Sequence, residues 1–258
     1  MTRAEYGGHG EAGMAGIEEH RLSFGSAAQI YERARPSYPA EALTWAIGAP
    51  PARVVDLGAG TGQLSRVALA AGFEVVPVEP DPQMRAALAR ANPGVTPLAG
   101  AAEAIPLPDG SADAIVVGTA YHWFDPATAH PEMARVLRGG GVLAPLWNDR
   151  DTSLDWTRQL DAIVKTAAFH RERLDADLDF GPLFTPAERA EFRHTVRQTP
   201  QGLLDLVASR SWYLTAAPAE QERLLNAVRE LCADHPDLAG RDSFELPYLT
   251  VAYRAVRR

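Results

Sequence analysis

The segment VVDLGAGTG, residues 54 to 62, is the feature that most limits what this chain can fold into. Its apolar run ends in three glycines at alternate positions, and helical spacing of apolar residues follows. A short apolar run closed by glycines is typical of a buried strand that enters a tight turn. Glycine lacks a Cβ, so a ligand can approach the backbone of such a turn. The segment therefore predicts a strand–turn–helix unit that binds a ligand.

Strand and helix signals alternate from 53 to 148, which predicts a parallel sheet with helices on both faces. The expected strands of this part are 53–58, 74–79, 95–100, 112–120 and 141–148. The expected helices between them are 61–72, 81–92 and 127–141.

The pattern changes after residue 150. Residues 150–185 are expected to form a helical insertion, because apolar residues recur at helical spacing from 152 to 174. The segment 186–258 is expected to contribute further strands at 191–199 and 243–256, with a helix at 218–233 between them.

The composition of the N-terminal residues predicts where the folded domain begins. Residues 1–22 are glycine-rich and aperiodic, which predicts a flexible tail. Residues 23–258 are then a single domain, in which 24–50 form N-terminal helices and 53–148 form the ligand-binding core.

Charge and cysteine usage exclude several function classes. The net charge of -8 argues against a dedicated nucleic-acid binder, which needs clustered Lys and Arg. The single cysteine, Cys232, permits no intrachain disulfide and fits a buried thiol. No apolar run reaches the length of a membrane span, and the start lacks a signal-peptide pattern. We expect a cytoplasmic protein with neither a membrane nor a nucleic-acid partner.

The spacing of the glycines disfavours two phosphate-binding motifs. A dinucleotide fold requires G-x-G-x-x-G, whereas Gly58, Gly60 and Gly62 are followed by Gln63. A P-loop requires a Lys after its last glycine, and none follows this turn. Glu79 ends the second expected strand about 20 residues beyond the turn, where a carboxylate can accept hydrogen bonds from ribose hydroxyls.

Four segments in order carry a resemblance to a known family: VVDLGAGTG, VVPVEPDPQM, GAAEAIPLPDGSADAIVVGTAYHWFD and ARVLRGGGVLAPLWN. Together they resemble the class I S-adenosylmethionine-dependent methyltransferases, and in particular a small-molecule subset with a His-Trp-Phe segment after its fourth strand. The resemblance implies a seven-stranded, mostly parallel Rossmann-like sheet in the order 3-2-1-4-5-7-6. It also implies S-adenosylmethionine as donor, S-adenosylhomocysteine as product, and a helical insertion on the substrate side.

By this resemblance, the glycine turn and the end of the second strand hold the donor. Gly58, Ala59 and Gly60 would pack against its methionine and ribose parts, and Glu79 would hold the ribose hydroxyls. The adenine side would be lined by two further residues, Pro80 and Met84.

The resemblance places four more residues around the donor. Relatives carry an Asp where this chain has Ala101, so backbone groups of Ala101 and Ala102 would read the adenine. Tyr31 and Arg35 resemble lid residues, and Arg35 would pair with the methionine carboxylate. Because the sulfonium already carries the positive charge, we expect no metal.

The segment TAYHWFD at the end of the fourth expected strand is the candidate catalytic region. Thr119 and Tyr121 are positioned to touch the donor. His122 has a side chain suited to proton abstraction near neutral pH, but a histidine that only shapes the pocket fits the sequence equally well. Trp123 and Phe124 are expected to be pocket walls.

The fifth expected strand ends in WNDRD, which should face the same cleft. Asn148 is a candidate for orienting substrate, and Arg150 and Asp151 are expected to pair with each other.

The predicted function is transfer of a methyl group to an oxygen, nitrogen or carbon atom of a small-molecule acceptor by in-line displacement. A non-catalytic protein that binds the donor or its product stays open as an alternative. An NAD(P)-dependent oxidoreductase is disfavoured by the glycine spacing.

Overall fold

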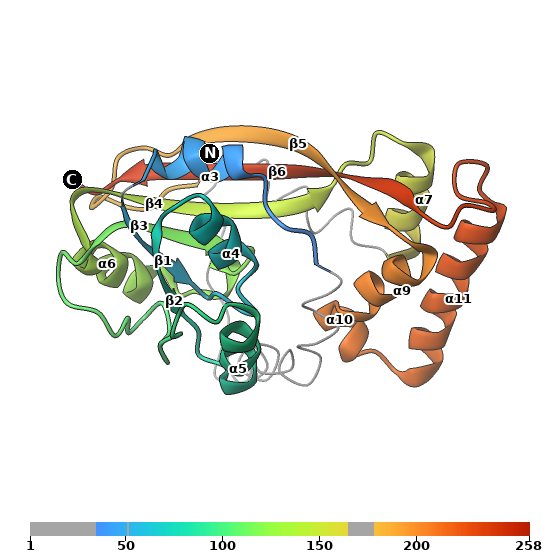
Figure 1. The fold of residues 1–258 in the computed structure, drawn as a ribbon, viewed down its shortest axis with the longest axis horizontal. Coiled ribbons are helices and arrows are strands. Elements are labelled where there is room, and N and C mark those ends of the chain that lie inside the picture. Colours follow the sequence, from blue (N-terminus) through green and yellow to red (C-terminus); the bar gives the residue numbers. More distant parts are fainter. Residues whose placement is uncertain (1–34, 51, 165–177) are drawn as a thin grey trace, which may run out of the picture.

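The computed structural model describes residues 35–50, 52–164 and 178–258. Within them lies a six-stranded sheet in the order β2-β1-β3-β4-β6-β5 (Figure 1). The strands are β1 Arg53–Leu57, β2 Glu74–Val78, β3 Ala112–Gly118, β4 Leu137–Arg150, β5 Glu188–Gln198 and β6 Phe244–Val256.

The sheet is parallel in one half and antiparallel in the other. β1 runs parallel to β2 and β3, and β3 runs parallel to β4. β6 is antiparallel to both of its neighbours, β4 and β5. This is the predicted strand order with its third strand left out.

The expected strand at 95–100, and with it the seventh strand of the sheet, is wrong. That segment forms only an isolated parallel bridge between Leu98 and Val78. The residue before Leu98 is Pro97, which has no N–H to donate to a ladder. The sheet therefore ends at β2 in the described residues.

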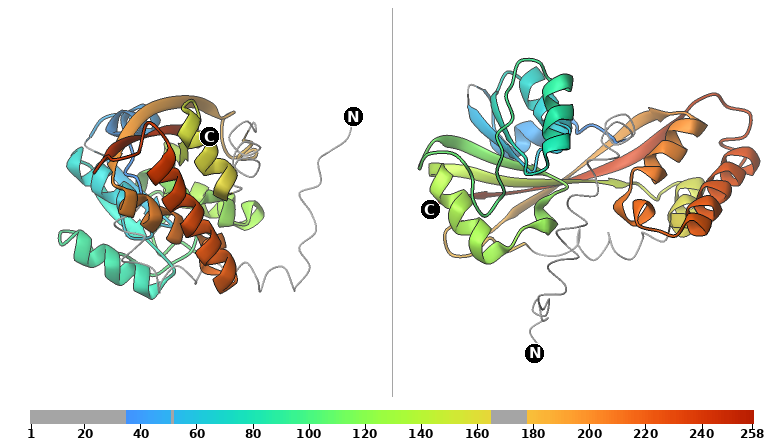
Figure 2. Two further views of the ribbon diagram at one scale, coloured as in Figure 1. Left: turned by 90° about the vertical axis from the view of Figure 1, so that its right-hand side faces the viewer. Right: turned by 90° about the horizontal axis from the view of Figure 1, so that it is seen from below.

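Helices cover both faces of the sheet, as the alternating pattern predicted (Figures 1 and 2). One face packs against α3 and α4, through a cluster that includes Leu43, Leu64 and Val116. The other face packs against α6 through Met133 and its neighbours. These helices are α3 Ala40–Ile47, α4 Gln63–Ala70, α5 Pro82–Ala91 and α6 Pro126–Val136.

A second group of helices forms what we call the helical lobe, at the far end of the longest strands (Figures 1 and 2). It consists of α7 Asp155–Val164, α9 Pro200–Ala208, α10 Ser211–Leu214 and α11 Pro218–Asp234. Its apolar core joins Trp156, Leu206 and Val228 to Phe244 and Leu246 at the start of β6. Only α7 falls in the segment expected to be a helical insertion, and residues 165–177 of that segment lie outside the described residues.

A buried ion pair links β4 to the helical lobe. Arg150, the last residue of β4, donates from its Nε to Asp161 Oδ1 of α7 at 2.7 Å and makes a second bond to the same oxygen. Both side chains are largely buried, with 6% and 11% exposed. The expected pairing of Arg150 with Asp151 is wrong, since Asp151 pairs with Arg193 of β5 across the sheet.

Removing one partner of this pair leaves an uncompensated buried charge, which is strongly destabilising. We expect Arg150→Met to lower the free energy of unfolding by about 3–5 kcal/mol in urea titrations. The matched control is Arg158→Met, since Arg158 pairs with Asp155 on the exposed face of α7. A control that destabilises as much as Arg150→Met would contradict the assignment.

Candidate functional site

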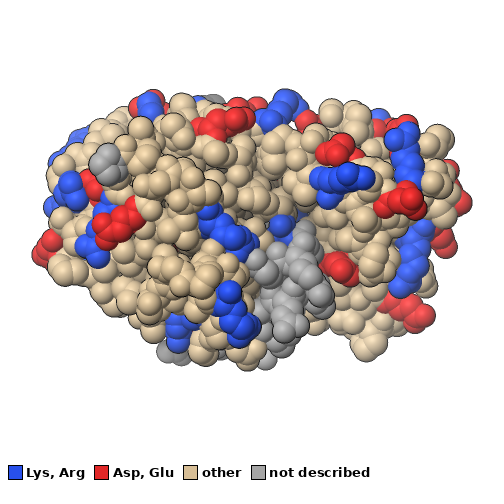
Figure 3. Space-filling view, in the orientation of Figure 1, with Lys and Arg blue, Asp and Glu red and all other residues tan. Residues whose placement is uncertain are grey.

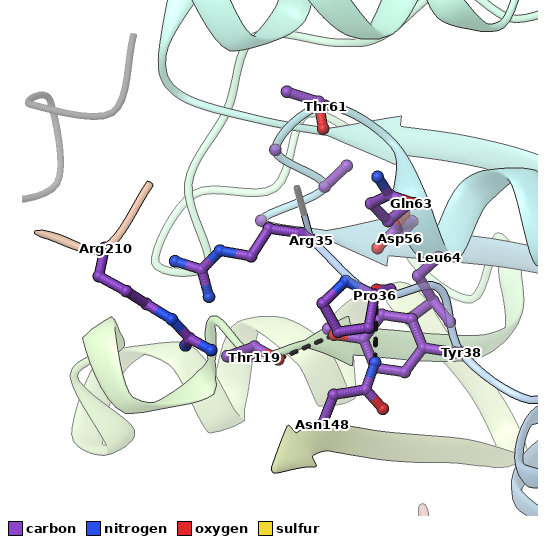
Figure 4. Close-up of a pocket in the computed structure, with 14 residues that line it drawn as sticks. Arg35, Pro36, Tyr38, Asp56, Thr61, Gln63, Leu64, Thr119, Asn148 and Arg210 are labelled. Carbon is purple, nitrogen blue, oxygen red and sulfur yellow. Dashed lines mark hydrogen bonds between the residues drawn. The ribbon is translucent and has the colours of Figure 1, made fainter. Parts of the chain in front are cut away.

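A pocket lies where β1, β3 and β4 end, between the glycine turn and the helical lobe (Figure 4). Open parallel sheets bind ligands at this edge of their strands. The residues that line the pocket are Arg35, Pro36, Tyr38, Asp56, Gly58, Ala59, Gly60, Thr61, Gln63, Leu64, Gly118, Thr119, Asn148 and Arg210.

The glycine turn holds its shape through backbone bonds to β2. The N–H groups of Gly58 and Ala59 both donate to the carbonyl of Val78, at 2.8 and 3.1 Å. Gly60 has a φ of +57°, and a Cβ placed on it would meet no heavy atom within 4 Å. The space beside Gly60 is thus open to a ligand, and its backbone conformation favours glycine.

The carboxylate of Glu79 is tied to this turn. Its Oε2 accepts a hydrogen bond from the Gly60 N–H at 2.8 Å, and its Oε1 accepts one from the Asp81 N–H at 2.9 Å. The residue is 7% exposed. Glu79 is not among the residues that line the pocket, but it lies directly behind one that does.

Thr119 is held in a strained conformation at the end of β3. Its φ of 57° is the one positive value of a non-glycine residue in the described part of the chain. The Thr119 N–H donates to the Leu146 carbonyl at 2.8 Å, and its Oγ1 lies 2.8 Å from the Tyr38 hydroxyl (Figure 4). Strain of this kind persists at sites where the surrounding structure fixes it, often functional ones.

Asp56 places a buried carboxylate on one side of the pocket (Figure 4). It is 1% exposed, and its Oδ2 accepts a hydrogen bond from Ser65 Oγ at 2.6 Å. Its Oδ1 is buried without a hydrogen-bond partner in the described residues. Burial raises the pKa of the Asp56 carboxyl to about 6, partly offset by the bond from Ser65. A positively charged group that donates a hydrogen bond, such as an ammonium, would satisfy this oxygen.

Two guanidinium groups converge on the opposite side of the pocket (Figure 4). Arg35 precedes α3, and Arg210 lies between α9 and α10 of the helical lobe. Arg35 donates to the carbonyl of Ser209, the residue before Arg210, at 3.3 Å. Figure 3 shows positively charged side chains in the hollow between the sheet and the lobe.

Burial lowers the pKa of Arg210 to about 9, with further contributions from the charges of Arg35 and Arg150. Its guanidinium therefore stays charged at neutral pH, in surroundings that are already positive. The pocket thus presents one carboxylate on one side and two cations on the other.

The predicted donor residues divide into two groups. Those that line the pocket are Arg35, Gly58, Ala59, Gly60 and Thr119. Those described but absent from its lining are Glu79, Pro80, Met84, Ala101, Ala102 and Tyr121. Tyr31 lies outside the described residues.

The predicted residues after β3 face a different environment. The Tyr121 hydroxyl lies 2.6 Å from His130 Nε2, and its ring contacts Phe180 and Trp147. Burial raises the pKa of Tyr121, and burial lowers the pKa of His130. The His122 ring packs on Trp123 with centroids 4.7 Å apart, and His122 is not a lining residue of the described pocket.

Sequence reasoning missed Tyr38, Asp56 and Arg210. A charged residue inside an apolar strand was a usable signal for Asp56, since buried carboxylates are rare without a role. Arg210 had no such signal, because nothing local distinguishes it from other arginines of the C-terminal part.

Within residues 35–50, 52–164 and 178–258, no His, Cys, Asp and Glu side chains form a group of three that would suit a metal ion. No helix within them has the length and apolarity needed to cross a membrane.

Comparisons with known proteins agree on one family. The family model described as a methyltransferase domain matches residues 55–144. An uncharacterized methyltransferase of Mycobacterium tuberculosis is 47% identical over 235 residues, which cover 91% of this chain and 95% of that protein. An uncharacterized methyltransferase of Schizosaccharomyces pombe is 29% identical over 231 residues, covering 86% and 92%. A solved structure of a candidate type II methyltransferase from Anaeromyxobacter dehalogenans has a TM-score of 0.56 at 25% identity, covering 86% and 97%.

The raised pKa of Asp56 has a consequence for stability. The folded protein holds its proton to higher pH than the unfolded chain, so the free energy of unfolding falls as pH rises from about 4 to about 6. We expect Asp56→Asn to remove this fall and to stabilise the protein at pH 7 by up to about 3 kcal/mol, measured in urea.

The control for this prediction is Ser65→Ala, which keeps the carboxylate but removes its hydrogen bond. This variant should retain the fall with pH and be less stable than the wild type at pH 7. A difference between wild type and Asp56→Asn that does not change with pH would contradict the assignment.

Proposed function

We propose that this chain, which belongs to the class I S-adenosylmethionine-dependent methyltransferases, transfers the methyl group of S-adenosylmethionine to a small-molecule acceptor. The observation that carries the proposal is the placement of charge around the glycine turn, with Asp56 on one side and Arg35 on the other. This arrangement matches the amino-acid end of the donor, which is a zwitterion.

The residues present suit the amino-acid end and the ribose of the donor. The unpartnered Oδ1 of Asp56 would accept from the ammonium group, and Arg35 would pair with the carboxylate. The open space beside Gly60 admits the ligand to the backbone. Glu79, already held behind Gly60, would exchange a backbone bond for the ribose hydroxyls.

The expected adenine contacts of Pro80, Met84, Ala101 and Ala102 belong to the same proposal. Met84 and Ala102 are buried, with 4% and 1% exposed, so contact with the adenine requires this wall of the site to open.

When bound, the donor supplies a methyl group made electrophilic by its sulfonium. The task left to the protein is to hold the acceptor in line behind that methyl group and to exclude water. The pocket is suited to this task, because it lies between the sheet edge and Arg210 of the helical lobe, and a hydrogen bond between Tyr38 and Thr119 fixes one of its walls.

His122 is the candidate catalytic residue of this region. Its position beside, but not within, the described pocket lining favours a role in shaping the site over proton abstraction. Tyr121 takes the same supporting role through its bond to His130 and is proposed to back the donor site.

The donor assignment is tested by calorimetric titration with S-adenosylhomocysteine. We expect wild-type protein to bind it, and Glu79→Ala to weaken binding by about 100-fold or more, because two hydrogen bonds to a charged acceptor are lost. Glu79→Gln, which keeps one acceptor oxygen, should fall between them.

The matched control is Glu74→Gln, which alters a carboxylate at the opposite, exposed end of β2. It should bind S-adenosylhomocysteine as the wild type does. Binding of NADH in its place, or binding that is indifferent to Glu79, would refute the donor assignment.

The role of His122 is tested by the pH dependence of kcat in His122→Asn. For a residue that shapes the site, we expect kcat to fall by about tenfold with the profile unchanged. Loss of one limb of the profile, with a fall of about 100-fold or more, would identify His122 as the general base instead.

A further inference from the structure

Three arginines approach the hollow between the sheet and the helical lobe, and they differ in their partners. Arg150 is paired with Asp161 inside the structure. Arg35 donates a hydrogen bond to the Ser209 carbonyl. Its proposed ligand is the carboxylate of S-adenosylmethionine. The guanidinium of Arg210 makes no hydrogen bond or ion pair with any of the described residues, although Asp149 lies near enough to favour its charge.

The residues that line the pocket include more cations than anions before a ligand enters. Arg35 and Arg210 are the two cations of its lining, and Asp56 is the one carboxylate among the described lining residues. S-adenosylmethionine adds a net positive charge, because it has an ammonium, a sulfonium and a single carboxylate. The donor therefore adds positive charge to a lining that already holds Arg35 and Arg210, whereas the Glu79 and Asp149 carboxylates are not part of that lining. An anion bound at Arg210 would lower the cost of burying its guanidinium.

The position of Arg210 indicates that this anion is a group of the methyl acceptor. Arg210 belongs to the helical lobe, whereas the donor's groups are matched by Asp56, Gly60 and Glu79 on the sheet edge. Figure 4 shows the Arg210 guanidinium beside Thr119, pointing into the same space as Arg35. A planar fork of this kind binds carboxylates through two parallel hydrogen bonds.

We propose that the acceptor is a small organic acid and that Arg210 binds its carboxylate. This inference rests on the proposed function and names the substrate class of the same site.

The test titrates acids into the protein, both free and loaded with S-adenosylhomocysteine. The probes are succinate, glutarate and benzoate, each beside its neutral amide. We expect at least one acid to bind with a Kd below about 10 mM and at least about tenfold more tightly than its amide. Arg210→Met should weaken the binding of that acid by at least about tenfold.

Two variants make the result specific to Arg210. Arg223→Met removes an exposed arginine from α11 and should leave acid binding unchanged. Arg35→Met should weaken the binding of S-adenosylhomocysteine by about tenfold or more, whereas Arg210→Met should change that binding by less than about threefold.

The inference is overturned if no acid binds in this range, if the amides bind equally well, or if Arg210→Met weakens S-adenosylhomocysteine as much as Arg35→Met does. Failure of the wild type to bind S-adenosylhomocysteine would instead refute the donor assignment. In that case, titration of the acids into the free wild type and the free Arg210→Met variant still tests whether Arg210 binds a carboxylate.

Discussion

The whole site depends on the bonds between the ends of β1 and β2. The backbone of the glycine turn donates to Val78, and the Gly60 N–H donates to Glu79. Parallel pairing of the two strands brings their carboxyl ends to one edge of the sheet, and this alone places the glycine turn beside the Glu79 carboxylate. Asp56 and Thr119 are fixed by the same strands and their neighbour β3.

Charge is distributed over this edge in a way that opposes stability and favours binding. The Asp56 carboxyl is buried with one oxygen unsatisfied, and the Arg210 guanidinium is charged in positive surroundings. Each would be less costly as an apolar residue, since buried charges without partners are unfavourable. Groups with strongly shifted pKa values cluster at functional sites.

The sequence predicted those parts of the structure that follow from local pattern. The glycine turn and the helices on both faces follow from short segments with clear periodicity, whereas the order of the six strands was implied by the family resemblance. The error at 95–100 was not visible in the local pattern, because β2, β4 and β6 each tolerate a proline, whereas 95–100 pairs with β2 only through the bridge between Leu98 and Val78.

The parts that could not be predicted depend on contacts between distant segments. Arg150 has an acidic neighbour in Asp151, yet it pairs with Asp161 because α7 folds back over the end of β4. Arg210 reaches the pocket only because the helical lobe packs on β6. Neither contact leaves a signal in nearby residues, and both decide the charge of the site.

The continuity of β4, β5 and β6 from the sheet into the helical lobe has an evolutionary consequence (Figure 2). The residues proposed to hold the donor lie at the ends of the first strands, while the helical lobe packs on the far ends of the last ones. Substitutions in α9 and α10 can therefore alter what the lobe presents to the pocket while the glycine turn keeps its geometry. A fold arranged in this way can change its acceptor through the lobe alone and inherit its donor unchanged.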